Sequence, residues 1–201
     1  RRLLDRHAAQ RVRLPAGAVQ RLAEATNAVG VRPGALRVVV SSGEQMRITE
    51  EVRAFAAAVP GLMLENQYGP TETHQVTYHT LTGDPARFPD LPPIGRPLDG
   101  VEVQVLDADL RPLPVGVTGE LFFGGDCLAR GSHRAPDLTR ERFLPHPWRE
   151  GARLYRTGDL GRLLPDGSVI WLGRADTQVK VRGFRIEPAE VALAIMRQAE
   201  R

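Results

Sequence analysis

Two short apolar runs with a helical pattern between them most constrain the fold of this chain. Residues 36–40 form a run rich in β-branched side chains, and residues 62–64 form a second run. Strands that are buried on both faces of a parallel sheet have this uninterrupted apolar form. Between the runs, Thr49 provides a helix N-cap, and two glutamates follow in the first turn of a helix that extends to Ala58. The pattern predicts a βαβ unit.

A second helical pattern precedes the first apolar run. Apolar residues recur at helical spacing over residues 14–29, with Pro15 in the first turn and Gly30 as a stop signal. The chain has 201 residues, 42% of them hydrophobic, and this is enough to bury a core. We therefore expect a parallel α/β sheet unit, incomplete in this chain, over residues 1–95.

The pattern changes after residue 95. Residues 101–105 alternate strictly between apolar and polar, residues 119–124 form a further strand, and residues 159–164 and 168–172 flank a Pro-Asp-Gly hairpin turn. We expect these antiparallel strands to close into a small β-barrel over residues 96–174, because closure removes exposed edges.

The composition argues against two classes of partner. The net charge of +3 comes from arginines scattered among acids, with Lys180 as the one lysine, and basic runs with interleaved aromatics are missing. Nucleic-acid binding is therefore not expected. Nor is a membrane partner, because no run of eighteen apolar residues occurs, and the start lacks both Met and a signal-like stretch. We expect a cytoplasmic protein, in which the single Cys127 forms no internal disulfide.

The most suggestive polar segment is residues 66–72, Asn-Gln-Tyr-Gly-Pro-Thr-Glu, directly after the second apolar run. Ligands of α/β sheets bind at the carboxyl ends of strands. The segment offers an aromatic plane for a base, a hydroxyl for a phosphate oxygen and a carboxylate for Mg²⁺. A nucleotide-binding loop and a tight surface turn are both consistent with the segment alone.

Two later segments are also polar and patterned. Residues 155–159, Tyr-Arg-Thr-Gly-Asp, place a carboxylate at the expected start of a strand, where it could accept hydrogen bonds from both ribose hydroxyls. An exposed turn aspartate is the alternative. Residues 173–187 are too polar for a core strand and too patterned for a linker, but alone they indicate no function.

Together, in this order and spacing, the three segments resemble the adenylate-forming superfamily, most closely the adenylation domains of nonribosomal peptide synthetases. Residues 94–97 and 119–131 agree with the same pattern. The resemblance implies an enzyme that joins an amino acid to the α-phosphate of ATP, releases pyrophosphate, and passes the aminoacyl group to the phosphopantetheine thiol of a peptidyl carrier protein. It also implies the first elements of an α+β C-terminal lid over residues 175–201.

The resemblance assigns roles to individual residues. It implies that Tyr68 stacks on adenine, that Asp159 holds the ribose with help from Arg174, and that Glu72 is the Mg²⁺ ligand. Thr71 and Glu72 are the implied catalytic residues, and Thr71 is implied to contact the α-phosphate. The implied ATP or AMP site consists of Asn66, Tyr68, Gly69, Thr71, Asp159 and Arg174.

The substrate side chain is implied to contact a second set of residues. These are Val40, Ser42, Gly43, Gln67, Gln75 and Val76. The polar members indicate a pocket with hydrogen-bonding capacity. Residues 41–44, Ser-Ser-Gly-Glu, depart from the family's usual paired glycines, so the floor of the pocket is expected to differ. Asp176 matches the family's hinge, and the loop with Lys180, Arg182 and Gly183 is implied to approach the carrier's thiol.

Two parts that the family uses are not in this sequence. No phosphate loop ending in Pro-Lys-Gly precedes the first segment, and no lysine follows Lys180. We therefore expect the isolated chain to be an inactive fragment of the enzyme. Two alternatives remain open, namely a stand-alone acyl- or aryl-CoA ligase of the same superfamily and a non-catalytic remnant that acts as an interaction module.

Overall fold

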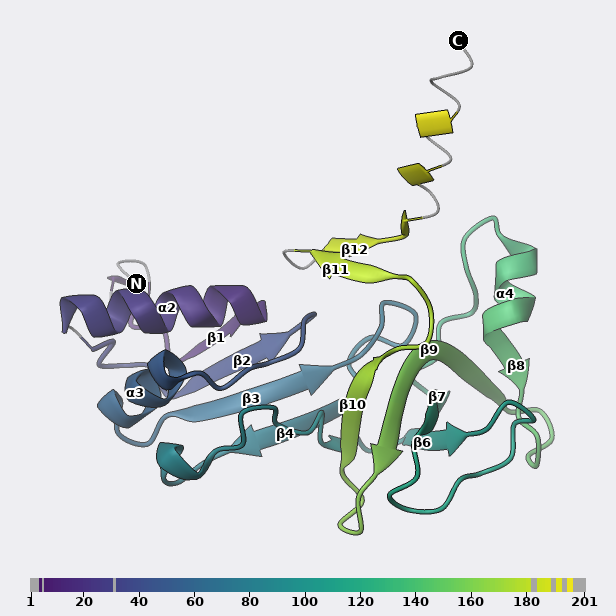
Figure 1. Ribbon diagram of the computed structural model, residues 1–201, viewed down its shortest axis with the longest axis horizontal. Helices are drawn as coiled ribbons and strands as arrows, with labels where there is room; N and C mark the ends of the chain where they lie inside the picture. The colour runs from purple at the N-terminus through teal and green to yellow at the C-terminus, as the bar shows by residue number, and fades with distance from the viewer. Residues whose placement is uncertain are drawn as a thin grey trace.

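The computed structural model describes residues 4, 6–30, 32–181, 184–188, 191–192 and 195–196. A five-stranded sheet forms the first half of the chain (Figure 1). Its strands follow one another in chain order: β1 (Arg11–Leu14), β2 (Val38–Ser42), β3 (Met63–Tyr68), β4 (Thr77–Leu81) and β5 (Arg96–Pro97). The first three are parallel, whereas β4 and β5 are antiparallel to their neighbours.

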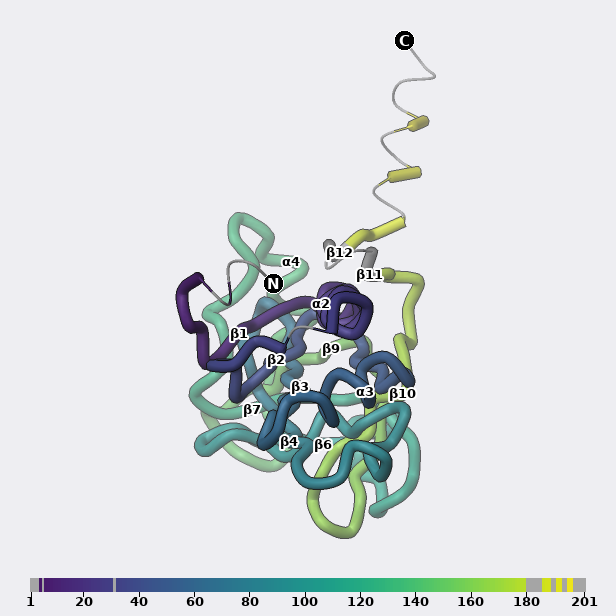
Figure 2. The backbone as a smooth tube through the Cα atoms, turned by 90° about the vertical axis from the view of Figure 1, so that its left-hand side faces the viewer, coloured from purple at the N-terminus to yellow at the C-terminus, as the bar shows by residue number. Residues whose placement is uncertain are grey.

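The two predicted helices are confirmed as α2 (Ala16–Val29) and α3 (Glu50–Ala58). Gly30 ends α2 with a φ of 66°, a left-handed conformation that suits glycine. Both helices pack on one face of the sheet, and Figure 2 shows α2 end-on over β1 and β2. Leu22 of α2, Phe55 of α3, and Val39 and Leu64 of the sheet share one buried core. Burial of this apolar face holds the layer together.

The expected parallel unit is confirmed in β1 to β3, but the sheet as a whole is mixed, because the antiparallel strands β4 and β5, which were not predicted, extend it. The chain leaves β3 through only eight residues, 69–76, before β4 begins. A parallel return to the same sheet needs a crossover of a dozen or more residues, so this short connection forces an antiparallel pair. Strand β1 was not predicted, because its four residues are too few to establish a period and end directly before Pro15.

The N-cap of α3 provides a test of how this helix is stabilised. The Thr49 hydroxyl oxygen accepts a hydrogen bond from the Val52 amide at 3.3 Å. Thr49→Ala leaves that amide without its cap, so we expect the free energy of unfolding to fall by about 1 kcal/mol. Chemical denaturation measures the change. The control Thr82→Ala, at an exposed position outside any strand or helix, is expected to stay within about 0.5 kcal/mol of the unsubstituted protein. Equal losses in the two variants would contradict the capping role.

The second half of the chain forms an antiparallel sheet of order β10-β9-β7-β6, with β8 paired to β9. Its strands are β6 (Val101–Leu106), β7 (Gly119–Gly125), β8 (Phe143–Pro145), β9 (Arg153–Leu163) and β10 (Val169–Arg174). The predicted hairpin joins β9 to β10, where the Leu164 amide donates to the Ser168 carbonyl at 2.8 Å.

The expected barrel closure is not found among the described residues, because β6 and β10 lie at opposite edges of an open sheet. Each edge is instead occupied by a nearby segment. On β10, the Val169 amide donates to the Gly95 carbonyl at 2.8 Å. On β6, the Val105 carbonyl accepts from the Leu113 amide at 2.9 Å. These contacts satisfy edge groups that closure would otherwise have satisfied.

Smaller elements complete the described chain, and a second core joins the sheets. The elements are the 3₁₀ turn η1 (Pro85–Arg87), the helix α4 (Pro136–Arg142) and the hairpin of β11 (Val179–Val181) and β12 (Phe184–Ile186). Tyr68 and Val76 of the first half pack with Phe123 and Trp171 of the second. None of the described helices has the length and apolar character needed to cross a lipid bilayer.

Candidate functional site

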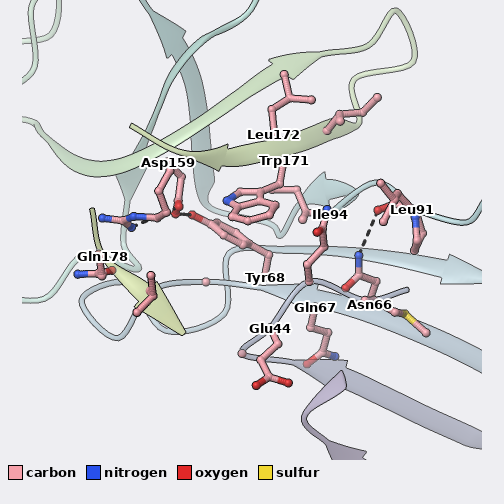
Figure 3. Close-up of a pocket in the computed structure, with 18 residues that line it drawn as sticks. Glu44, Asn66, Gln67, Tyr68, Leu91, Ile94, Asp159, Trp171, Leu172 and Gln178 are labelled. Atoms are coloured by element: carbon pink, nitrogen blue, oxygen red, sulfur yellow. Dashed lines mark hydrogen bonds and ion pairs between the residues drawn. The ribbon is translucent and has the colours of Figure 1, made fainter. Parts of the chain in front are cut away.

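A cavity of about 460 Å³ lies where the two sheets meet (Figure 3). One wall comes from the carboxyl end of β3 and the segment that follows β2, with residues Gly43, Glu44, Gln45, Met46, Asn66, Gln67, Tyr68 and Gly69. The opposite wall comes from β9, β10 and the segment that follows, with residues Asp159, Ile170, Trp171, Leu172, Arg174, Gln178 and Val179. Leu91, Pro92 and Ile94 close the remaining side.

Tyr68 and Asp159 meet across this cavity although 91 residues separate them. The Tyr68 hydroxyl donates a hydrogen bond to Asp159 Oδ2, and Arg174 Nη1 lies 3.3 Å from Asp159 Oδ1. Arg174 Nη1 also donates to the Thr157 carbonyl at 3.0 Å. The Asp159 residue is only 5% exposed. Such a buried carboxylate needs these partners, because an unpaired buried charge is costly.

The charges of this group act on one another. Burial raises the pKa of the Tyr68 hydroxyl well above its usual value, and the negative charge of Asp159 raises it further. Tyr68 therefore keeps its proton and remains a donor. Burial lowers the pKa of Arg174, but its hydrogen bond to Asp176 and the charges of Asp159 and Asp176 outweigh this and raise it. The same hydrogen bond lowers the pKa of Asp176, so the pair is ionised near neutral pH.

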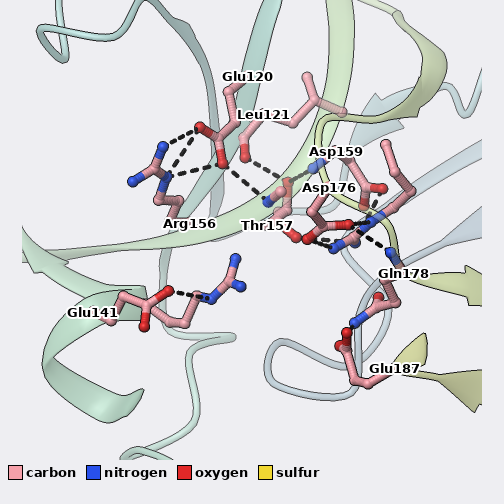
Figure 4. A network of polar contacts seen from close by, with 12 residues as sticks. Glu120, Leu121, Glu141, Arg156, Thr157, Asp159, Asp176, Gln178 and Glu187 are labelled. Atoms are coloured by element: carbon pink, nitrogen blue, oxygen red, sulfur yellow. Dashed lines mark hydrogen bonds and ion pairs between the residues drawn. The ribbon is translucent and has the colours of Figure 1, made fainter. Parts of the chain in front are cut away.

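Backbone contacts fix Asp159 in place (Figure 4). The Asp159 amide donates to the Thr157 hydroxyl at 2.8 Å, and that hydroxyl donates to the Leu121 carbonyl at 2.7 Å. Gly158 has a φ of 74°, and a Cβ there would lie 2.8 Å from both Arg174 Nη2 and Asp176 Oδ2. Any other residue would be strained at this φ and would displace the two side-chain ends, so glycine suits this position. Asp159 lies within β9, not at the start of a strand as predicted.

The predicted loop at residues 66–72 is in part a strand, because β3 continues to Tyr68. Asn66 lies in that strand, where its amide nitrogen donates to the Pro93 carbonyl at 2.8 Å. After Tyr68 the chain turns tightly and returns, and the Val76 amide donates to the Tyr68 carbonyl at 2.9 Å. Thr71 is exposed and Glu72 is half-buried, and neither lines the cavity.

The residues predicted for the substrate pocket fall into three groups. Val40, Ser42 and Gln67 lie on the sheet face opposite to Asn66 and Tyr68, because side chains alternate along a strand and residues in parallel register share a face. In Figure 3, Gln67 and Glu44 point away from Trp171. Gly43 and Gln67 line the cavity.

The remaining two predicted pocket residues follow Glu72 in the chain. Gln75 is half-buried, and Val76 is fully buried in the core between the sheets.

The predicted hinge residue Asp176 contacts Arg174, which lines the cavity. Asp176 binds Arg174 and also accepts a hydrogen bond from the Gln178 amide at 3.2 Å. The Gln178 side chain donates to Glu187, which ties the chain before β11 to the chain after β12 (Figure 4). The backbone of Lys180 pairs with that of Arg185. Arg182 and Gly183, predicted for the thiol-facing loop, lie outside the described residues.

Trp171 and Gln178 are cavity residues that sequence reasoning missed. The Trp171 ring lies over Tyr68 in Figure 3, and Gln178 is 5% exposed. A large aromatic residue in a hairpin strand was the available signal for Trp171, but the same pattern describes ordinary core packing. Gln178 gave no local signal, because a buried amide is recognisable only from its partners.

The chemistry of the cavity fits a nucleotide. It combines aromatic faces for a base with a buried carboxylate whose two oxygens offer about four acceptor sites, more than Tyr68 and Arg174 use. Among the described residues, no group of three or more His, Cys, Asp or Glu side chains is placed to hold a metal. Mg²⁺ commonly binds through one or two carboxylates together with substrate phosphates, so Glu72 alone is compatible with that use.

Comparisons with known proteins show the family of the chain. The model of the AMP-binding enzyme family matches residues 2–133. A linear gramicidin synthase protein from Brevibacillus parabrevis is 49% identical over 164 residues, which is 81% of this chain and 3% of that protein. Tyrocidine synthase 2 from the same organism is 44% identical over 160 residues, 79% of this chain and 4% of that protein. The chain thus spans a small part of these curated relatives.

A solved structure shows the same fold over nearly the whole chain. It is holo-PA1221, a nonribosomal peptide synthetase protein that contains adenylation and PCP domains and is bound to a vinylsulfonamide inhibitor. The match has a TM-score of 0.85 at 30% identity and covers 98% of this chain and 34% of that one. The chain therefore belongs to the AMP-binding enzyme family, and it corresponds to part of the adenylation domain of a nonribosomal peptide synthetase.

Proposed function

We propose that this chain supplies the nucleotide-holding part of an enzyme that activates an amino acid with ATP. The product is an aminoacyl-adenylate, with release of pyrophosphate, and the aminoacyl group then passes to the phosphopantetheine thiol of a carrier protein. The observation that carries the proposal is the contact of Tyr68, Asp159 and Arg174 at one cavity between the two sheets. Family membership supports the same reaction class.

Each group at the cavity has a role that its chemistry supports. Tyr68 and Trp171 offer faces for adenine, and the Asn66 amide is oriented by its bond to the Pro93 carbonyl. The Asp159 carboxylate would accept hydrogen bonds from ribose hydroxyls, and its ion pair with Arg174 supports this role by holding the carboxylate in place.

The tight loop after β3 supplies the groups for the phosphate and the metal. Thr71 and Glu72 lie in this loop, where a hydroxyl and a carboxylate suit the α-phosphate and Mg²⁺. When bound, Mg²⁺ would neutralise phosphate charge.

The carrier partner is proposed from the relatives. The PA1221 structure contains a PCP domain beside its adenylation domain. In this chain, Asp176 lies at the junction between β10 and the β11–β12 hairpin, where a rotation of the following segment would need few backbone changes. A neighbouring carrier domain or protein is therefore the proposed acceptor of the aminoacyl group.

Two measurements on the 201-residue chain test the nucleotide site. AMP titrated into the chain in a calorimeter is expected to bind saturably. The same chain, supplied with ATP, Mg²⁺ and a mixture of amino acids, is expected to show no amino-acid-dependent pyrophosphate exchange, because its sequence holds neither the phosphate loop nor a lysine after Lys180. Absence of AMP binding would contradict the proposed nucleotide site. Robust exchange would contradict the expectation that the reaction needs a phosphate loop and a lysine that this sequence does not hold.

A complete adenylation domain that carries these 201 residues tests the reaction itself. It is expected to exchange pyrophosphate into ATP in the presence of at least one amino acid. If only carboxylic acids without an amino group support exchange, the acyl- or aryl-CoA ligase alternative holds instead. If nothing supports exchange while AMP still binds, the activation of an amino acid is contradicted.

A further inference from the structure

The sheet face opposite to the helices carries an ordered set of polar side chains on three parallel strands. Register places Arg13 beside Val40 and Ser42 beside Gln67, with Glu65 on the same face. Three of these residues, Val40, Ser42 and Gln67, belong to the set for which the family resemblance implies contact with the substrate side chain. The charges on this face therefore bear directly on which amino acid fits.

The single acid among these strand residues is already neutralised. Arg11 Nη2 lies 2.6 Å from Glu65 Oε2, and Glu65 Oε1 accepts a hydrogen bond from Gln67 Nε2 at 2.9 Å. A carboxylate only accepts, so the nitrogen of the Gln67 amide must face Glu65. The charge of Glu65 is therefore paired with Arg11, and one of the two hydrogens on the Gln67 amide nitrogen is taken.

Arg13 is the charge that remains. Its Nε donates to the Ser42 hydroxyl oxygen at 3.0 Å, and in the part of the chain that the structure describes no carboxylate pairs with it. This single bond fixes the direction of the guanidinium while leaving its two Nη groups as donors. The Ser42 oxygen accepts from Arg13, so the hydroxyl hydrogen remains a further donor. Two adjacent side chains thus present donors and one positive charge.

We propose that Arg13 and Ser42 select an amino acid whose side chain carries a carboxylate. This rests on the proposed function, and it adds the substrate class. A planar guanidinium fork matches the two oxygens of a carboxylate, and the serine hydroxyl can donate to one of them. Arg13 is exposed and Ser42 is half-buried, so an apolar side chain that covered them would displace water and leave the guanidinium and hydroxyl donors unpaired. Sites built to hydrogen-bond a substrate group discriminate strongly against analogues that lack that group.

The test uses a complete adenylation domain that carries these 201 residues. Pyrophosphate exchange is measured with each of the twenty standard amino acids, among them aspartate, glutamate, asparagine, glutamine, leucine and phenylalanine. One of the two acidic amino acids is expected to give the highest kcat/KM. Arg13→Gln is expected to lower that kcat/KM by about 100-fold, with a smaller change for amide or apolar substrates, because a charge-assisted pair is lost.

Arg87→Gln is the matched control, because Arg87 is an exposed arginine on η1 without a described charge partner. It is expected to leave every kcat/KM unchanged. Preference for a neutral amino acid would overturn the inference, and so would an equal loss of kcat/KM for all substrates in Arg13→Gln. In either case, the exchange itself would still support the proposed function. Exchange with none of the twenty amino acids would contradict the proposed function itself. Unchanged AMP binding by Arg13→Gln shows that the variant is folded.

Discussion

Replacing Gly69 by alanine is expected to lower the free energy of unfolding by about 4 kcal/mol. A Cβ at this position would lie 1.7 Å from the His74 carbonyl oxygen and 2.8 Å from the Gln75 Cα. Both obstacles are backbone atoms of the loop that returns from β3 to β4, and that loop is held by the bond from the Val76 amide to the Tyr68 carbonyl. No side-chain rotation can relieve the overlap, so the loop must open.

Thermal denaturation measures this effect, and a loss of this size corresponds to a fall in Tm of about 10 °C for a chain of this length. Gly34→Ala is the matched control. A Cβ at Gly34 has no atom within 4 Å and its backbone needs no positive φ, so its Tm is expected to stay equal or rise slightly. A Gly69→Ala variant with an unchanged Tm would show that the loop has another accessible conformation.

The second large effect is expected from Asp159→Ala, which should weaken AMP binding by about 1,000-fold. Two hydrogen bonds from ribose hydroxyls to a charged acceptor, each contributing about 1.5–3 kcal/mol, account for a loss of about 4 kcal/mol. Calorimetric titration gives the dissociation constant. Asp99→Ala removes the same charge at an exposed position and is expected to bind AMP as the unsubstituted chain does.

Dideoxy-AMP, which lacks both ribose hydroxyls, separates a direct contact from a general disturbance. The unsubstituted chain should prefer AMP to the dideoxy compound by the same factor that Asp159→Ala loses, and the variant should not distinguish the two. If the variant still prefers AMP, the ribose is held elsewhere. The variant should also titrate Tyr68 at lower pH, because the negative charge of Asp159 contributes to the raised pKa of that hydroxyl.

Local sequence patterns were enough to predict the helices and strands that keep one hydrophobic pattern along most of their length. Helices α2 and α3 show helical spacing with clear ends, and β2 begins with three consecutive valines. Strand β1 was missed because its four residues are too few for a reliable period. Strand β9 was predicted to begin near Asp159, because Gly158 looks like a break, yet the strand continues through that glycine at a φ of 74°.

The sequence allowed several residues of the site to be named, but it did not show how they contact one another. Tyr68, Asp159 and Arg174 were named from three separate segments, but their mutual contact depends on how two sheets pack, which no local pattern encodes. Trp171 and Gln178 were identified as cavity residues only from the structure. Barrel closure was wrong for the same reason, since the edge partners Gly95 and Leu113 come from segments with no strand pattern of their own.

The order of the strands in the first sheet has a consequence for recombination between related synthetases. Because β1 to β4 follow one another in sequence and in space, Arg13, Ser42 and Gln67 all lie on one continuous stretch, residues 11–81. Asp159 and Arg174 lie far downstream of it. A crossover in the segment between β4 and β5 would transfer this sheet face between genes as a unit. It would also give each hybrid a Tyr68 from one parent and an Asp159 from the other, so the contact forms again only where both parents carry these residues.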